Sequence, residues 1–286
     1  MQTIDIGCKT DRGQRRRRNE DAVLVRSKKE SSGKAGPIYL LAVADGVGGS
    51  VGGSIASREA VRALADCFVQ DRTSDPRALL RDGFRGANAR IRRLADRQAR
   101  LQGMCSTLVA AIVAKRRAWV ANVGDSRAYF MRNGQIGRLT QDHTWVAEQV
   151  KAGQMTEEEA MSSPNRNIIT RCVGSKDTLS IDLVAPLNLR PGDILLLCSD
   201  GLTGIVSEAE IASACLKSSP AVAAQELVDL ANRRGGPDNI SVVVGQAHDV
   251  ATETAPTRMG RATVEGNPVL LLAVVVSAMS LGGGIP

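Results

Sequence analysis

The 286 residues are enough for one large domain, or two small ones, with a sizeable core. Hydrophobic residues make up 43% of the chain, as in ordinary soluble proteins, but aromatic residues supply only 2%, which excludes a core built on aromatic rings. The formal net charge of +7 suits phosphorylated partners or a solvated basic face, whereas nucleic acid is not an expected partner because few rings are present for bases to stack on.

The six cysteines are scattered, contain no C-x-x-C pair, and lie mostly in apolar runs: Cys8, Cys67, Cys105, Cys172, Cys198 and Cys215. This pattern is typical of reduced, buried thiols and not of a disulfide framework or a zinc site. The chain opens on a short alternating strand, and no apolar segment of a secretory signal follows it. We therefore expect the folded part of the chain to lie in the cytoplasm.

Alternating or continuous apolar patterns predict three strands in the first part of the chain, at residues 3–13, 21–27 and 38–44. Helical spacing follows at 54–69 and 75–101, with Ser54 and Asp75 as the predicted N-caps.

Three further strands are predicted at 107–114, 118–123 and 127–132, and the Asn-Gly pair in "RNGQ" predicts a hairpin turn after the last of them. Residues 142–170 form a polar, helical segment interrupted by "SSPNRN". The remaining elements are two strands, two helices and a last strand, at 177–186, 192–201, 207–216, 221–233 and 239–247. Because strands and helices come in runs and do not alternate strictly, the order favours an α+β domain with mainly antiparallel sheets.

The composition changes after the last predicted strand, so we expect one domain at 1–249 and a linker at 250–268. The C-terminal tail, 269–286, holds an uncharged run of a length at the short limit for spanning a bilayer. Arg258 and Arg261 on its N-terminal side would keep the domain on the cytoplasmic face, whereas the triple glycine argues against a span. Two interpretations remain open, a membrane anchor and a docked or mobile apolar tail.

The stretch "YLLAVADGVGGSVGGSIAS" raises the choice between a phosphate-binding loop and a turn that presents a carboxylate. A P-loop requires a lysine after its last glycine, and no lysine lies between Lys34 and Lys115. The dinucleotide fingerprint G-x-G-x-x-G fails too, because Val51 stands at its third glycine position. The remaining interpretation is Asp45 at the end of a strand, with glycines that allow close approach to it.

Similar carboxylates recur in turns beside other apolar strands: Glu20, Asp21, Asp125, Asp200 and Asp238. Each one alone is most simply a turn residue. Together they suggest a shared site, because clustered carboxylates repel one another unless cations neutralise them. Mg²⁺ and Mn²⁺ prefer such oxygen ligands, so the set predicts a site for more than one divalent metal ion.

The motifs that hold these residues resemble the bacterial type of the PP2C (PPM) metal-dependent protein serine/threonine phosphatases over about residues 3–247. They occur in the family's order: "RRRNEDA", "VADGVGGSVGGSIAS", "CSTLVAAIV", "ANVGDSRAY", "LTQDHTWV", "NIITRCVGS", "ILLLCSDGLTGIVSEAEI" and "GGPDNISVVV". The resemblance implies a four-layer α-β-β-α sandwich of two antiparallel sheets flanked by helices.

The resemblance also implies the roles of individual residues. Asp45 would bridge two metal ions, the Gly46 carbonyl would be a ligand, and Asp200 and Asp238 would complete the set. The acidic pair formed by Glu20 and Asp21 would hold metal-bound water. In bacterial members the counterpart of Asp125 helps to hold a third, weaker metal ion.

Arg16 corresponds to the family's phosphate-binding arginine, and its planar guanidinium suits two phosphate oxygens. Its neighbours in the arginine run are interpreted as a solvated basic turn. The implied reaction is hydrolysis of phosphoserine or phosphothreonine in proteins by in-line attack of a hydroxide that bridges two metal ions. The implied cofactors are two or three divalent cations, Mn²⁺ or Mg²⁺. The implied partners are a Ser/Thr kinase and its phosphorylated substrates, and we expect a monomer.

Three departures concern the leaving-group acid and the glycine stretch. Val47 stands where eukaryotic members often carry a histidine, and Ser50 and Gly53 stand where bacterial relatives commonly carry histidine and glutamate. His143 is interpreted as structural, which leaves metal-bound water as the preferred acid. Residues 142–170 match the family's flap, the expected source of substrate choice, although a solvated helical hairpin is the simpler interpretation.

Two other functions are weighed. The first is a pseudophosphatase that binds phosphoproteins without turnover, which would require a lost metal ligand. The second is a phosphatase for small phosphate esters or for a signalling partner of the anti-sigma type.

Overall fold

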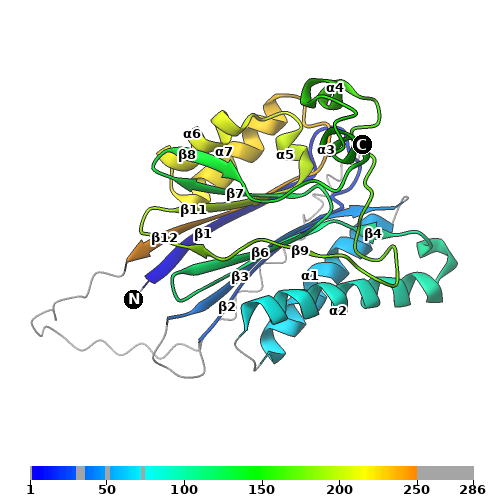
Figure 1. Cartoon of the computed structure of the whole chain (residues 1–286), viewed down its shortest axis with the longest axis horizontal. Helices are drawn as coiled ribbons and strands as arrows, with labels where there is room; N and C mark the ends of the chain where they lie inside the picture. The colour runs from blue at the N-terminus through cyan, green and yellow to red at the C-terminus, as the bar shows by residue number, and fades with distance from the viewer. Residues whose placement is uncertain (1, 30–35, 49–51, 72–74, 250–286) are drawn as a thin grey trace, which may run out of the picture.

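Two antiparallel sheets face each other, and a pair of helices covers the outer face of each (Figure 1). The computed structural model describes residues 2–29, 36–48, 52–71 and 75–249. The predicted linker, 250–268, and tail, 269–286, lie outside these ranges. Within them, no helix is both long and apolar enough to cross a membrane.

The first sheet joins both ends of the described chain. Its order is β1 (Gln2–Asp11), β12 (Ile240–Asp249), β11 (Ile194–Cys198), β7 (Arg127–Arg132) and β8 (Gln135–Arg138). The second sheet has the order β10 (Leu187–Asn188), β6 (Arg117–Val123), β5 (Leu108–Ala114), β3 (Ile38–Val47) and β2 (Asp21–Lys28). Two short strands extend it, β4 (Cys105–Ser106) beside β3 and β9 (Asp182–Leu183) beside β6.

The helices form the outer layers. The second sheet is covered by α1 (Gly52–Gln70) and α2 (Pro76–Arg97), which is followed by a 3₁₀ turn, η1 (Ala99–Leu101). The first sheet is covered by α6 (Glu208–Lys217) and α7 (Pro220–Arg233), with the short α5 (Asp200–Thr203) directly after β11. The two remaining helices, α3 (Trp145–Lys151) and α4 (Glu157–Ser162), lie in the segment 142–170.

Strand β3 shows why its sequence is apolar without interruption. Successive side chains of a strand point to opposite faces. Leu40 and Ala42 pack beneath α1 and α2, whereas Leu41 and Val43 pack in the core between the sheets. Both faces are therefore buried, and the sandwich is the predicted α-β-β-α arrangement.

Several predicted boundaries need correction. The Ser54 cap was wrong, because α1 already includes Gly52 and Ser54 lies inside its first turn. Asp75 is confirmed, since its side chain accepts a hydrogen bond of 3.0 Å from the Arg77 backbone N–H, with proline at the first helical position. The strand predicted at 177–186 is reduced to β9 and its neighbouring loop.

Candidate metal centre

The predicted acidic residues lie at one end of the sandwich. Asp21 begins β2 and is paired directly with Asp45 near the end of β3. The other two acidic residues belong to the first sheet, where β11 and β12 are neighbours. Asp200 follows β11 as the first residue of α5, and Asp238 precedes β12. A Cβ atom on Gly201 would lie 3.4 Å from Cβ of Asp238, so the last two turns also touch each other.

These carboxylates act on one another electrostatically. Burial raises the pKa of Asp45 well above its ordinary value, and the neighbouring charges of Asp21 and Asp200 raise it further. Burial likewise raises the pKa of Asp21 to about 7, against the hydrogen bonds that it accepts from Ser241 and Ser199. The turns therefore place mutually repelling carboxylates in one region.

Asp200 and Asp125 belong to the same group. The pKa of Asp200 is raised by burial and then by Asp238, and Asp45 hydrogen-bonds with Asp200. Burial raises the pKa of Asp125 to about 8, and the charge of Asp200 adds to it. Within the described structure, the Oδ1 atoms of Asp21, Asp125 and Asp200 are buried without a hydrogen-bond partner.

Unpartnered carboxylate oxygens fit hard divalent cations, which bind oxygen ligands and offset the repulsion between them. In the part of the chain that the structure describes, no three His, Cys, Asp or Glu side chains are arranged so that they could hold a metal ion. Asp238 instead accepts a hydrogen bond of 2.7 Å from Nη2 of Arg16. The predicted ligands thus converge, but Arg16 occupies one of the carboxylates that a metal ion would need.

Asn239 holds the turn at residues 12–20, which carries Arg16. This role was not predicted from the sequence. The amide nitrogen of Asn239 donates to the carbonyls of Arg12 and Arg18, at 2.8 and 2.9 Å. Its amide oxygen accepts from the Glu20 backbone N–H at 2.8 Å. Asn239 therefore fixes the turn that carries Arg16 and the acidic pair, and its only signal in the sequence is its position directly after Asp238.

Close backbone packing surrounds Gly46. The Gly46 N–H donates to the Glu20 carbonyl at 3.2 Å, and a Cβ on Gly46 would overlap the Gly53 carbonyl. A Cβ on Gly53 would lie 2.6 Å from the Gly46 oxygen and 3.0 Å from the carboxyl carbon of Glu20. The departure at Gly53 therefore has a local reason, because this backbone leaves no room for a side chain there.

A second missed feature is the clasp, residues Ser106 and Thr107, which holds the backbone of Asp45. The Ser106 hydroxyl and the Thr107 N–H both donate to the Asp45 carbonyl, each at 2.8 Å. The Asp45 N–H donates in turn to the Thr107 hydroxyl at 2.9 Å. The small polar residues in "CST" thus position the carboxylate at the centre of the site.

His143 supports the turn before Asp125. Its Nδ1 accepts a hydrogen bond of 3.0 Å from the Gly124 N–H, so the proton lies on Nε2, which is 3.1 Å from Oδ2 of Asp182. Burial lowers the pKa of His143, which keeps the ring neutral. The geometry agrees with the structural interpretation of this histidine.

The segment 142–170 is fixed at both ends beside the site. The Arg127 guanidinium donates two hydrogen bonds to Oδ2 of Asp142, at 2.7 and 3.2 Å, and the Thr170 N–H donates to the His143 carbonyl at 2.8 Å. Met161 and Ile168 between these anchors are 78% and 49% exposed. The segment is therefore a fixed arm that carries two exposed apolar side chains.

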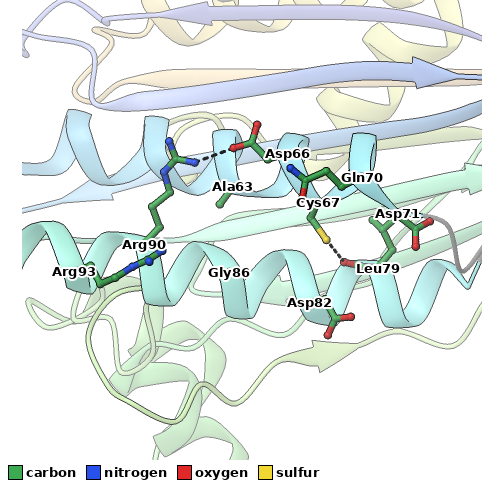
Figure 2. Close-up of a pocket in the computed structure, with 10 residues that line it drawn as sticks. All are labelled: Ala63, Asp66, Cys67, Gln70, Asp71, Leu79, Asp82, Gly86, Arg90 and Arg93. Carbon is green, nitrogen blue, oxygen red and sulfur yellow. Dashed lines mark hydrogen bonds and ion pairs between the residues drawn. The ribbon is translucent and has the colours of Figure 1, made fainter.

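Two other hollows lie away from the carboxylates. A groove of 520 Å³ runs between α1 and α2, and Figure 2 shows Arg90 reaching across it to Asp66. A second hollow of 370 Å³ lies at the opposite ends of β2 and β3, lined by Lys28 and Trp119. Neither is lined by a predicted site residue, so the carboxylate end remains the candidate centre.

Comparison with known proteins agrees with this geometry. The sequence pattern of the family described as protein phosphatase 2C matches residues 11–232. The serine/threonine phosphatase stp of Listeria welshimeri is 39% identical over 243 residues, 82% of this chain and 93% of the relative. The crystal structure of the Mycobacterium tuberculosis serine/threonine phosphatase PstP/Ppp has a TM-score of 0.77 and 36% identity, covering 86% of this chain and 99% of that chain.

A catalytic domain of PstP in complex with two manganese ions has a TM-score of 0.76 and 35% identity, covering 87% of this chain and 100% of that chain. The ions bound by that neighbour are of the class predicted from the sequence, divalent metal ions. The matches extend over most of the chain. The chain belongs to the protein phosphatase 2C family.

Proposed function

We propose that this protein hydrolyses phosphoserine and phosphothreonine in other proteins, with the site at the carboxylate end of the sandwich. The observation that carries the proposal is the proximity of Asp21, Asp45 and Asp200, with buried, unpartnered oxygens on Asp21 and Asp200, next to the guanidinium of Arg16. Glu20, Asp125, Asp238 and the Gly46 carbonyl are the other proposed ligands or water-holding groups.

Divalent cations bound there would supply a hydroxide nucleophile at neutral pH and offset the charge of the transferring phosphoryl group. The chain's own residues then have separate tasks. Arg16 exchanges Asp238 for two oxygens of the substrate phosphate, because a planar guanidinium can donate to both at once. Asn239 keeps the Arg16 turn in register with Glu20, and the Ser106–Thr107 clasp keeps Asp45 in place.

The leaving serine or threonine oxygen needs a proton. His143 is unsuitable, because both of its ring nitrogens are engaged and the ring is 1% exposed. His248, at the far end of β12, interacts with Asp5 and is remote from the site. Solvent water at the rim is therefore the proposed proton source.

The arm at 142–170 is anchored through Asp142 on Arg127, two residues after Asp125, and its exposed Met161 and Ile168 offer apolar contacts that suit a phosphoprotein better than a small ester. We extend the proposal to the substrates: they are proteins phosphorylated by a bacterial Ser/Thr kinase. The phosphatase domain, residues 1–249, acts on them as a monomer in the cytoplasm. The linker and the membrane contact of the tail stay predictions.

The test compares hydrolysis of a phosphothreonine peptide by the wild type and by Asp45→Asn, with added Mn²⁺. Asp82→Asn, which changes an exposed carboxylate on α2, is the matched control. We expect loss of activity in Asp45→Asn alone; equal rates in all three proteins would refute the assignment. A small aromatic phosphate ester assayed in parallel separates a peptide-selective enzyme from a general phosphatase.

The second candidate, a phosphoprotein-binding module with little turnover, is favoured by one observation. Arg16 is paired with Asp238, an arrangement that competes with metal binding. Tight binding of a phosphopeptide without Mn²⁺-dependent turnover would support this function.

A further inference from the structure

Two cysteines meet next to the clasp on Asp45, in a place that the proposed reaction does not use. Strand β4 pairs with β3 through Gly46↔Ser106 and Val47↔Cys105. On its other side, Ser106 and Val173 exchange two backbone hydrogen bonds of 2.9 and 2.7 Å.

Cys105 and Cys172 each precede one of the two bonded residues, Ser106 and Val173. In an antiparallel pair, residues offset in this way lie diagonally on the same face. Each thiol is the largest influence on the pKa of the other, so the two lie close together. The pair joins the strand beside Asp45 to the chain that leaves the arm at 142–170.

The two thiols differ in character. The neighbouring Cys105 thiol lowers the pKa of Cys172 to about 7, and Cys172 is half-buried, so its thiolate can meet a small oxidant. The Cys172 thiol, followed by burial, raises the pKa of Cys105, which is 8% exposed. One accessible thiolate beside one protected thiol is the arrangement of an attacking and a resolving cysteine.

The other four cysteines lack this arrangement. Burial raises the pKa of Cys8 and of Cys67, and raises that of Cys198 and of Cys215 to about 12 in each case. The contrast isolates one pair among the six, and it is a pair that the scattered sequence positions did not predict.

We propose that Cys105 and Cys172 form a peroxide-sensitive dithiol whose disulfide lowers the phosphatase activity. The Cys172 thiolate attacks one oxygen of hydrogen peroxide, the O–O bond breaks, and the released hydroxide takes up a proton to leave as water. Cys172 is then a sulfenic acid. The Cys105 sulfur attacks the Cys172 sulfur, its proton leaves with the displaced hydroxide as a second water, and the two thiols have given two electrons to the peroxide.

Closing the disulfide changes the geometry around Asp45. Diagonal neighbours in a ladder have Cα atoms about 7–8 Å apart. A disulfide needs about 4.4–6.8 Å, so the two segments must approach by about 1 Å. Ser106 follows Cys105 directly and donates to the Asp45 carbonyl, so this movement acts on the clasp. Misplacement of a reacting group by about 1 Å is enough to lower a rate by about 10²-fold.

The experiment treats the reduced full-length protein with hydrogen peroxide, removes the peroxide, and maps disulfides by differential alkylation and mass spectrometry. We expect a peptide pair linked through Cys105 and Cys172. Activity toward a phosphothreonine peptide should fall by about tenfold or more and return with dithiothreitol. Absence of this link in the treated wild type, or a link without loss of activity, would overturn the proposal.

Three variants sharpen the result. Cys172→Ser should keep the activity of the reduced protein and resist peroxide, and Cys105→Ser should stop at a Cys172 sulfenic acid that a dimedone probe labels. Cys67→Ser, which changes another half-buried cysteine, should respond as the wild type does. Reversible inhibition of Cys172→Ser equal to that of the wild type would contradict the proposal. Disulfide mapping on the wild type needs no catalysis, so its outcome is separate from the assignment of the metal ligands.

Discussion

The core between the sheets and the carboxylate end of the same sandwich are built from the same strands but meet opposite demands. Leu41 and Val43 in β3 and Leu197 in β11 are fully buried among apolar neighbours. Two or three residues further along the chain, Asp45 and Asp200 lie close to other carboxylates. Burial raises the pKa values of both, and the neighbouring negative charges raise them further. Apolar burial stabilises the first region, whereas the second becomes favourable only with a counter-charge.

The largest expected effect is on catalysis at the carboxylate end. Asp200→Asn should lower the rate of phosphothreonine peptide hydrolysis by about 10²–10³-fold, as removal of one group that stabilises transition-state charge does. Its free energy of unfolding in EDTA should be unchanged or higher, because a repelling carboxylate is removed. Steady-state kinetics and urea unfolding check the two halves of this prediction, and a clear loss of stability in EDTA would contradict it.

Strand β11, which leads to Asp200, should show the opposite balance at its core residue Leu197: a loss of stability without a loss of activity. Leu197→Ala should lower the free energy of unfolding by about 2–5 kcal/mol, because it removes buried methyl groups and leaves a cavity. Activity per folded molecule should stay close to that of the wild type. Urea unfolding combined with kinetics at low temperature measures both quantities. If this variant lost activity while keeping its stability, the division between the two regions would be wrong.

At the carboxylate end, Arg16 supplies a positive charge that pairs with Asp238. Arg16→Lys should raise KM for the peptide by about tenfold, because an ammonium cannot reproduce the bidentate contact with phosphate. Arg16→Ala should also bind Mn²⁺ more tightly, since Asp238 is released. Arg15→Lys is the matched control, with an unchanged KM expected. If Arg16→Lys and Arg15→Lys changed KM equally, Arg16 would be only a solvated residue of the basic turn and not the phosphate-binding arginine.

A further expected effect is a dependence of stability on pH. In the folded chain the pKa values of Asp21 and Asp125 are about 7 and about 8, above the ordinary value of 3.8. The folded state therefore binds more protons than the unfolded state between about pH 4 and pH 8, and its stability falls as pH rises through that window.

Mn²⁺ should weaken this dependence, because the cation favours the ionised carboxylates. Thermal unfolding from pH 5.5 to 8, with EDTA or with Mn²⁺, measures it. Asp21→Asn should flatten the EDTA curve. Identical slopes in EDTA and in Mn²⁺ would count against the shared origin of the two pKa shifts.

The sequence was sufficient to predict the sandwich, the strand-end carboxylates and their convergence, because apolar patterns and D-G turns are local signals and the motif order carried a family resemblance. It did not predict the partner of Arg16, since Asp238 is 222 residues away and no periodic pattern encodes that contact. The Asn239 hydrogen bonds, the Ser106–Thr107 clasp and the thiol pair were missed for the same reason. Each joins segments that lie far apart in the sequence and appears only in the folded chain.

The most direct test is a calorimetric titration of Mn²⁺ into the full-length chain, into Asp45→Asn, and into Asp82→Asn as the control. If acidic turns from both sheets share one cation-binding region, the wild type and Asp82→Asn bind at least two ions per chain, as in the manganese-bound structural neighbour, and Asp45→Asn binds fewer or binds them much more weakly. A wild type that binds no Mn²⁺, or an Asp45→Asn variant with the same stoichiometry and affinity, would contradict the account.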